Sequence, residues 1–262
     1  SFRARGAMTQ GGSDVLASLQ ALLGGDVVLP PTAATDRHLF DHRRLYRGSA
    51  VALAQPRSTA QVAMLLAFCN ERRIGVVPQG GNTSYCGGAT PDETGTQLLL
   101  SLEKMSRVRA LDPVDGSLIA EAGCLLATLQ QAAADVDRLL PLSLGSEGSC
   151  QLGGNLSTNA GGTNVLRYGM ARDLVLGLEV VLPDGRMLDA LRTLRKDNTG
   201  YDVKSLFLGA EGTLGVISAA ALRLFPAPHS VGTALIGVDD VAAAVTLLDT
   251  LRIDSGERLS SF

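Results

Sequence analysis

Three glycine-rich segments punctuate the chain, and each one follows an apolar run. They read VVPQGGNTSYCGG (residues 76–88), GSEGSCQLGGNLSTNAGG (145–162) and GAEGTLGV (209–216). Glycine lets backbone N–H groups come close to a ligand, and Ser, Thr and Asn side chains add further donors. Three such loops in one chain predict a large anionic ligand that is held mainly by the backbone, such as a dinucleotide.

The common nucleotide signatures are absent from these segments. The sequence has no GxxxxGK[ST] phosphate loop, no GxGxxG fingerprint after the first strand and no GxSxG elbow. A single glycine-rich loop would be more often a tight surface turn than a ligand site. The repetition of the pattern after three strand-like runs favours the ligand-binding interpretation.

Composition bounds the class of protein. Of the 262 residues, 45% are hydrophobic and 19% are charged, which is typical of a globular chain. The net charge of −3, the absence of Trp and an aromatic content of 4% argue against a nucleic-acid partner. Four cysteines without a CxxC pair exclude a zinc-finger spacing and indicate a reducing compartment. No membrane-spanning stretch and no signal peptide are visible, so we expect a cytoplasmic protein.

Hydrophobic periodicity predicts an α+β fold, because hairpins are mixed with single helices. Ser58 is a candidate N-cap for a helix that ends near Arg73. We expect further helices over 14–23, 125–138, 201–207 and 239–251. Strands are expected at IGVVP (74–78) and over 97–102, 106–112, 117–123, 173–182, 215–225 and 233–238, with a PVDG turn (113–116) joining the third and fourth.

Several titratable residues invite a catalytic or metal-binding interpretation. His38 and His42 are four residues apart, but the HExxH pattern fails, so we expect structural or surface histidines. Glu147 and Glu211 lie in the glycine-rich segments, where a capping role is commoner for a carboxylate than that of a general base. The RKDN cluster (195–198) is expected to be solvated.

In this order, PQGGNTSYCGG, PLSLGSEGSCQLGGNLSTNAGG with LRYG, LGLEVVLPDGRML and LRKDNTGYDVKSLFLGAEGTLGVI resemble FAD-linked oxidases. The family has the vanillyl-alcohol-oxidase fold, whose FAD domain is also called PCMH-type. Within it, the sequence is most similar to the D-2-hydroxyglutarate and D-lactate dehydrogenases and the glycolate oxidase FAD subunit. The resemblance covers roughly residues 40–228.

The resemblance implies two α+β lobes with FAD extended between them. The FAD domain would occupy 1–228, with a first lobe at about 40–112 and a second at about 113–228, and residues 229–262 would begin a substrate or cap domain that is cut short. Carried over residue by residue, the pyrophosphate loop comprises Pro78, Gly80, Gly81, Asn82, Thr83, Ser84 and Gly88. The ribityl and flavin contacts comprise Gly145, Gly148, Ser149, Gly153, Gly154, Asn155, Thr158 and Asn159. Backbone contacts to the cofactor comprise Gly212, Gly215 and Ile217.

Some family members tether the flavin through a His, occasionally with a Cys. No His lies in or beside the three segments, so we expect non-covalent FAD, with Cys86 and Cys150 as the alternative. Relatives more often read PLDLGAKGSC where this chain has Ser143, Ser146 and Glu147.

The resemblance implies a flavin-dependent dehydrogenase that oxidises a 2-hydroxy acid to the 2-oxo acid and passes electrons to an acceptor that the sequence does not name. In the family, the substrate arginine, the catalytic histidine and a metal site lie beyond the matching region. We therefore assign no catalytic residue and no metal site, and expect the chain alone to turn over little.

Three alternatives remain open: a sugar or aryl alcohol as the substrate, a non-catalytic FAD-binding module, and a glycine-rich scaffold without a cofactor. The RKDNTGYD stretch (195–202) argues against the first. If a cap normally covers the flavin, an apolar face would be exposed, and a homodimer is one expected consequence.

Overall fold

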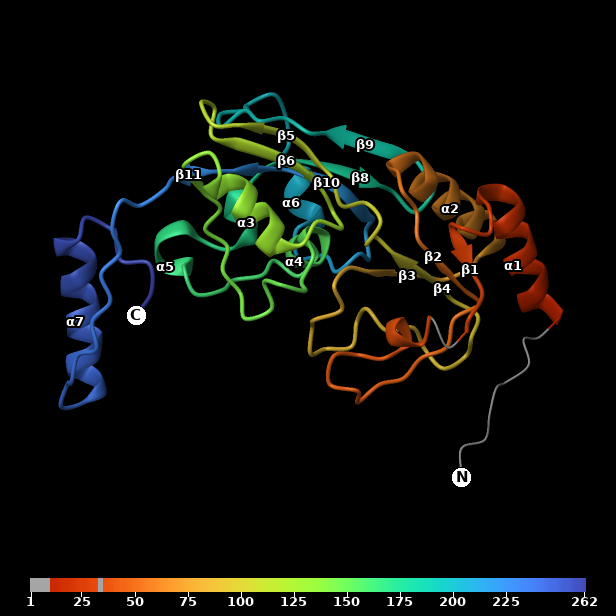
Figure 1. Ribbon diagram of the computed structural model, residues 1–262, viewed down its shortest axis with the longest axis horizontal. Helices are drawn as coiled ribbons and strands as arrows, with labels where there is room; N and C mark the ends of the chain where they lie inside the picture. Colours follow the sequence, from red (N-terminus) through yellow and green to blue (C-terminus); the bar gives the residue numbers. More distant parts are fainter. Residues whose placement is uncertain (1–9, 33–34) are drawn as a thin grey trace.

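The computed structural model describes residues 10–32 and 35–262, which form two sheets with helices around them (Figure 1). The N-terminal part holds α1 (Gln10–Leu23), β1 (Val28–Leu29), the 3-10 helix η1 (Asp36–Leu39), β2 (Ala52–Ala54), α2 (Thr59–Arg72), β3 (Val76–Gln79) and β4 (Leu98–Ser101). Its four strands lie in the order β1-β2-β4-β3, and β2, β4 and β3 are mutually parallel. The β2–α2–β3 crossover is therefore a small βαβ unit within an α+β fold.

The second sheet has five antiparallel strands in the order β5-β6-β10-β8-β9. They are β5 (Val108–Asp112), β6 (Ser117–Glu121), β8 (Val175–Val181), β9 (Met187–Ala190) and β10 (Val216–Arg223). Around them lie α3 (Leu126–Ala134), α4 (Leu152–Ser157), α5 (Val165–Tyr168), η2 (Ala171–Leu174) and α6 (Lys204–Phe207), together with the short pair β7 (Arg138–Leu139) and β11 (Phe225–Pro226).

The best-predicted element is α2. Ser58 has an extended backbone and its hydroxyl accepts a hydrogen bond from the Gln61 N–H, as an N-cap does. The apolar face of the helix buries Val62, Leu65 and Cys69. Arg73 ends the helix in the left-handed region with φ 54°, which turns the chain directly into β3.

Several boundaries differ from the sequence-based predictions. The strand expected over 173–182 begins at Val175, because residues 171–174 form η2, and the strand expected over 215–225 is divided into β10 and β11. The helix expected over 201–207 covers Lys204–Phe207 alone. Within the second glycine-rich segment, Leu152–Ser157 is helical rather than loop.

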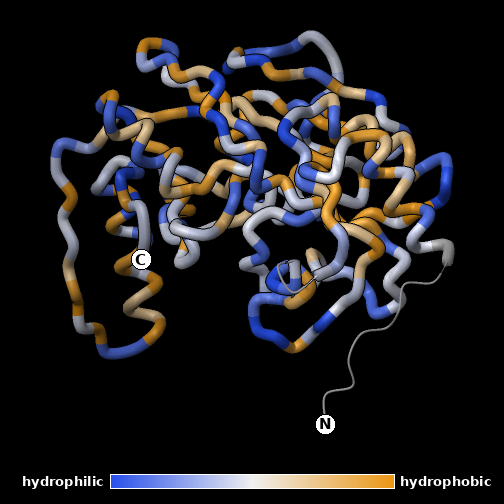
Figure 2. The backbone as a smooth tube through the Cα atoms, turned by 45° about the vertical axis from the view of Figure 1, so that its right-hand side comes forward, coloured by the Kyte–Doolittle hydropathy of each residue, from blue (hydrophilic) through white to orange (hydrophobic). Residues whose placement is uncertain are grey.

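The C-terminal segment differs from the rest of the chain. The strand predicted over 233–238 is wrong, because that run is extended without a partner strand to pair with. The predicted helix follows as α7 (Val241–Asp254), with Asp240 as its N-cap, and none of its residues is buried. Figure 2 shows this helix beside the body with hydrophobic residues along it, and Val241 and Ile253 are largely exposed.

Two main hydrophobic cores fill the body. One lies under the five-stranded sheet and includes Leu118, Leu129 and Leu178. The other lies around the four-stranded sheet and also takes in Ala122, Val181 and Val216 from the second sheet. The two sheets are therefore joined by apolar packing at the place where the glycine-rich segments meet.

Candidate cofactor-binding site

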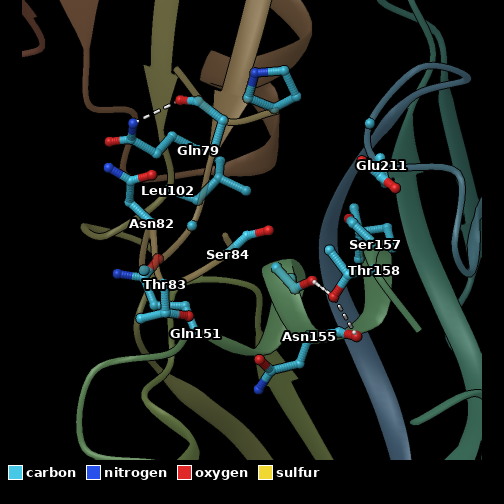
Figure 3. Close-up of a pocket in the computed structure, with 18 of the residues that line it drawn as sticks. Gln79, Asn82, Thr83, Ser84, Leu102, Gln151, Asn155, Ser157, Thr158 and Glu211 are labelled. Atoms are coloured by element: carbon cyan, nitrogen blue, oxygen red, sulfur yellow. Dashed lines mark hydrogen bonds between the residues drawn. The ribbon is translucent and has the colours of Figure 1, made fainter. Parts of the chain in front are cut away.

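The glycine-rich segments line one cavity of about 260 Å³. Its first wall is residues 78–84, at the end of β3; its second wall is residues 151–160 and 211–217, from α4 and the start of β10. In Figure 3, Asn82, Thr83 and Ser84 lie on one side, and Thr158, Ser157 and Glu211 lie across from them. Three segments far apart in sequence thus converge on one space.

The first wall presents a row of free amides. Within the described part of the chain, the structure records no acceptor for the backbone N–H groups of residues 80 to 84, which follow the last ladder pair between Gln79 and Ser101. Unpaired N–H groups in succession form a concave donor set for an anion, and cavity-lining groups of this kind otherwise bond to water. The arrangement suits the oxygens of a pyrophosphate.

Side chains hold this wall in place from behind. Asn82 has φ 52°, in the left-handed region that Asn tolerates, and its Nδ2 donates to the Phe40 carbonyl at 2.6 Å. The buried Gln79 side chain bonds to His38 Nδ1 at 2.7 Å and donates to the carbonyls of His38 and Ala89. These side-chain bonds fix the loop without using its backbone N–H groups.

The second wall is built by close backbone packing. A methyl group at Gly153 would lie 2.7 Å from Ala122 Cβ, and one at Gly215 would lie 2.9 Å from the Val181 carbonyl oxygen. Gly212 has φ 77°, and its Cα lies against the Pro78 ring, where a methyl group would come to 2.5 Å. Several amides here are already used, as when Gly153 N donates to the Ala122 carbonyl at 2.7 Å.

The two walls touch at Gly81. A side chain there would collide with the Ser149 carbonyl oxygen and would lie 2.9 Å from Cys150 Cα. Glycine is needed at this position because no other residue allows the two segments to come so close.

One buried polar atom at this junction has no partner. Gln151 precedes α4, is only 8% exposed and lines the cavity, yet its Oε1 accepts no hydrogen bond. An unsatisfied buried carbonyl of this kind costs about 1–3 kcal/mol. A ligand that donated a hydrogen bond to it would remove that cost, so the residues present fit a large polar cofactor.

Most of the sequence-predicted site residues lie along this cavity. The structure brings together Pro78, Gly80, Gly81, Asn82, Thr83, Ser84, Gly88, Gly153, Gly154, Asn155, Thr158, Gly212, Gly215 and Ile217. It does not place Gly145, Gly148, Ser149 or Asn159 on the cavity surface. Ser149 lines an adjoining cavity, and the Asn159 side chain accepts a hydrogen bond from the Arg172 N–H at 3.1 Å.

Sequence reasoning missed four polar lining residues: Gln79, Gln151, Ser146 and Ser157. Gln79 is the last residue of β3, and Gln151 precedes the unpredicted helix α4. Alternation along the strand and recognition of a helix start at Leu152 are the signals that would have found the first two.

The two glutamates of the glycine-rich segments have different surroundings. Glu147 accepts hydrogen bonds from Ser143 Oγ at 2.6 Å and from the Leu144 N–H, and the Ser143 bond is the main reason that the pKa of Glu147 is lowered. The expected capping role is therefore observed. Glu211 lines the cavity with φ 52°. Within the described residues, no group of three or more His, Cys, Asp or Glu side chains could hold a metal ion.

The two N-terminal histidines and the RKDN cluster can also be located in the structure. His38 is buried against Gln79, as a structural histidine would be, and the ring of His42 lies 5.4 Å from that of Tyr85. In the RKDN cluster, the exposed Asp197 pairs with Arg192 at 3.0 Å. None of the helices in the described residues is long and apolar enough to cross a membrane.

Comparison with known proteins agrees with this geometry. Residues 50–191 match the family described as FAD binding domain. The mitochondrial D-2-hydroxyglutarate dehydrogenase of Bos taurus is 45% identical over 249 residues, which are 95% of this chain and 45% of that protein. The D-2-hydroxyglutarate–pyruvate transhydrogenase of Saccharomyces cerevisiae is 39% identical, over 95% of this chain and 50% of that protein. The chain thus spans about half the length of these curated relatives.

Solved structures confirm the α+β fold. An alkyldihydroxyacetonephosphate synthase superposes with a TM-score of 0.74 at 22% identity, over 83% of this chain and 41% of the other. A variant of Phl p 4, described as a glucose oxidase, gives 0.68 at 16% identity, over 82% and 44%. Proteins of different named activity thus share the fold. The chain belongs to the FAD-binding domain family, and its cofactor is FAD.

Proposed function

We propose that this chain binds FAD non-covalently in the cavity between its two walls, as part of a flavin-dependent D-2-hydroxyacid dehydrogenase. The observation that carries the proposal is the run of N–H groups from Gly80 to Ser84 that have no acceptor among the residues that the structure describes. Oriented amides favour an anion in a partly buried site, and the FAD pyrophosphate is the anionic part of the cofactor.

The residues proposed to contact FAD are those expected from the sequence. Pro78, Gly80, Gly81, Asn82, Thr83, Ser84 and Gly88 would hold the pyrophosphate. Gly153, Gly154, Asn155, Thr158, Gly212, Gly215 and Ile217 would line the remaining length of the cofactor. Gly145, Gly148, Ser149 and Asn159 are proposed as contacts at its margin; a methyl group at Gly145 or Gly148 would meet nothing within 4 Å. Gln151 is added for its unpartnered oxygen.

The non-covalent mode is supported by the residues around the cavity. No histidine is among its lining residues in the described part of the chain. Cys150 is buried and its Sγ accepts from Asn155 Nδ2 at 3.4 Å, while Cys86 is exposed. These two thiols are the covalent alternative considered from the sequence.

In the whole enzyme, this chain would position the cofactor rather than react with the substrate. Bound FAD supplies a two-electron acceptor for the hydride that leaves a 2-hydroxy acid. The first wall would orient the cofactor through its amides, and the packed second wall would exclude water from its face. No residue of this chain is assigned as the catalytic base.

Names of relatives support the substrate class, since those in Bos taurus and Saccharomyces cerevisiae act on D-2-hydroxyglutarate. A sugar is the second candidate substrate, favoured by the fold likeness to a glucose oxidase. The electron acceptor, the homodimer and the cytoplasmic location remain predictions; the Bos taurus relative is named as mitochondrial.

The domain division is also a proposal. We retain an FAD domain over residues 1–228 and a further domain that begins near 229. The β5–β6 hairpin crosses the expected lobe boundary at 112/113. We therefore propose that the first lobe ends between Ser101 and Val108, where the chain passes from one sheet to the other.

Reconstitution tests the cofactor proposal. Purified chain is mixed with excess FAD, passed through a desalting column and examined for flavin absorbance, before and after denaturation with trichloroacetic acid. We expect about one FAD per chain, released into the supernatant by the acid. Folded protein that retains no flavin would contradict FAD binding, and flavin that stays with the precipitate would contradict the non-covalent mode.

A further inference from the structure

The two sheets meet along a seam that is largely apolar. Ala122, Val181 and Val216 of the second sheet share a core with residues of the first, such as Leu98 and Leu100. Apolar burial is non-directional, so it holds the two halves together without selecting one separation between them. Directional contacts across this seam would add to the close backbone packing at Gly81 in fixing the width of the cavity.

One buried carboxylate supplies such contacts. Glu179 of β8 is 8% exposed, and its Oε1 accepts hydrogen bonds from Thr59 Oγ1 at 2.5 Å and from Ser218 Oγ at 2.7 Å. Arg109 donates to both carboxylate oxygens at 3.1 Å through its two terminal nitrogens. We call Thr59, Arg109, Glu179 and Ser218 the Glu179 cluster.

The members of this cluster belong to elements that lead to both cavity walls. Thr59 is the first residue of α2, and α2 runs through Arg73 into β3 and the first wall. Ser218 occupies the irregularity in the β8–β10 register, directly after Ile217, which lines the second wall. Its carbonyl accepts from Ala122 N, and Ala122 is the residue against which Gly153 packs.

Within the cluster, the guanidinium of Arg109 pairs with the carboxylate of Glu179. Burial disfavours the charged carboxylate most strongly, but the hydrogen bonds from Arg109, Thr59 and Ser218 together hold the pKa of Glu179 below its ordinary value. Charge-assisted hydrogen bonds of this kind are short and directional. Buried ionic groups in otherwise apolar interfaces add little stability but can specify one arrangement among several.

We propose that Glu179 is a positioning residue that, through Thr59 and Ser218, sets the separation of the two walls of the cavity. The proposal rests on the assignment of that cavity to FAD. The carboxylate itself lines neither wall, so it acts on cofactor affinity through the backbone that its partners hold.

The test separates positioning from simple stability. Thr59→Val removes the hydroxyl that reaches Glu179 and keeps the side-chain shape, whereas Thr59→Ser keeps the hydroxyl. Ala133→Gly, in the buried face of α3 away from the seam, is a control that destabilises the fold by loss of a methyl group and of helix propensity. The dissociation constant for FAD and the melting temperature without FAD are measured for each.

We expect the Thr59→Val chain to bind FAD about fivefold more weakly, because part of a charge-assisted hydrogen bond is lost from the bound geometry. Thr59→Ser should bind like the wild type, and Ala133→Gly should lose melting temperature but not affinity. Ser218→Ala, which removes a second donor, repeats the test if Thr59→Val does not fold.

Unchanged affinity in Thr59→Val and Ser218→Ala would overturn the inference, as would an equal loss in Ala133→Gly. A wild-type chain that binds no FAD overturns the assignment of the cavity instead, so the two failures can be told apart.

Discussion

The two walls of the cavity use glycine for different purposes. In the first wall, the backbone N–H groups of residues 80–84 have no acceptor in the described part of the chain, and side chains behind the loop hold it. In the second wall, Gly153 and Gly215 pack against Ala122 and Val181, and the Gly153 amide is already bonded. One wall therefore offers hydrogen-bond donors, and the other allows close backbone packing. Substitutions in each should therefore fail differently.

The largest effect is expected where the walls touch. In Gly81→Ala, the new methyl group would collide with the Ser149 carbonyl oxygen, and backbone atoms cannot yield without moving one wall. We expect FAD to bind about 100-fold more weakly, which corresponds to about 3 kcal/mol. Fluorescence titration of FAD measures this loss.

Gly232→Ala is the matched control, because a methyl group at Gly232 meets nothing within 4 Å. It should bind FAD like the wild type. Retention of wild-type affinity in Gly81→Ala would show that the walls are not held at this contact.

A smaller effect is expected behind the first wall. Asn82→Ala removes the hydrogen bond to the Phe40 carbonyl and places alanine at φ 52°, which costs about 1–2 kcal/mol. The amide row would then relax, and we expect FAD to bind about tenfold more weakly by calorimetry.

Asn82→Gly separates the two causes, because glycine adopts this conformation freely but makes no side-chain bond. Intermediate affinity is expected. If both variants bind FAD as tightly as the wild type, the first wall does not depend on Asn82 for its shape.

The difference between the walls also explains what the sequence could predict. PQGGNTS follows an apolar strand and is read by its glycines and small polar residues, so its position on the cavity was predictable. Gln151 was missed because the start of α4 at Leu152 was not recognised, and the burial that leaves its oxygen unpartnered appears only in the folded chain. Gly145 and Gly148 match the family motif, yet the chain path leaves them off the cavity surface. The Glu179 cluster joins residues up to 159 positions apart, from Thr59 to Ser218, and only the folded chain brings them together.

A third prediction concerns the unpartnered oxygen between the walls. Gln151→Leu removes a buried acceptor that the protein does not satisfy, so the chain without FAD should be as stable as the wild type or more so. If FAD donates a hydrogen bond to this oxygen, its affinity should fall about fivefold. Melting temperature and FAD titration are measured on the same preparation.

Thr90→Val is the control for this split. Thr90 Oγ1 is also buried without a partner, but Thr90 does not line the cavity. Its replacement should leave FAD affinity unchanged. Equal affinity of the Gln151→Leu and Thr90→Val chains would remove Gln151 from the proposed contacts.

The smallest effect is expected from a change of pH, which acts on buried carboxyls behind the two walls. Burial opposes the ionisation of the buried carboxyls of Glu121 and Glu179. Hydrogen bonds and charges from Arg107 and Arg109 nevertheless hold the pKa of Glu121 below its ordinary value, and Arg109, Thr59 and Ser218 do the same for the pKa of Glu179. A carboxyl with a lowered folded-state pKa stabilises the fold above the pKa of the unfolded chain, and this contribution is lost as the pH falls through the folded value. The melting temperature of the chain without FAD should therefore be level near neutral pH and decrease in acid. Glu179→Gln should melt lower at neutral pH and show a shallower decrease in acid, since one of the carboxyls with a lowered pKa is gone. If the melting temperatures of the two chains decrease equally steeply in acid, Glu179 does not contribute to the pH dependence of stability.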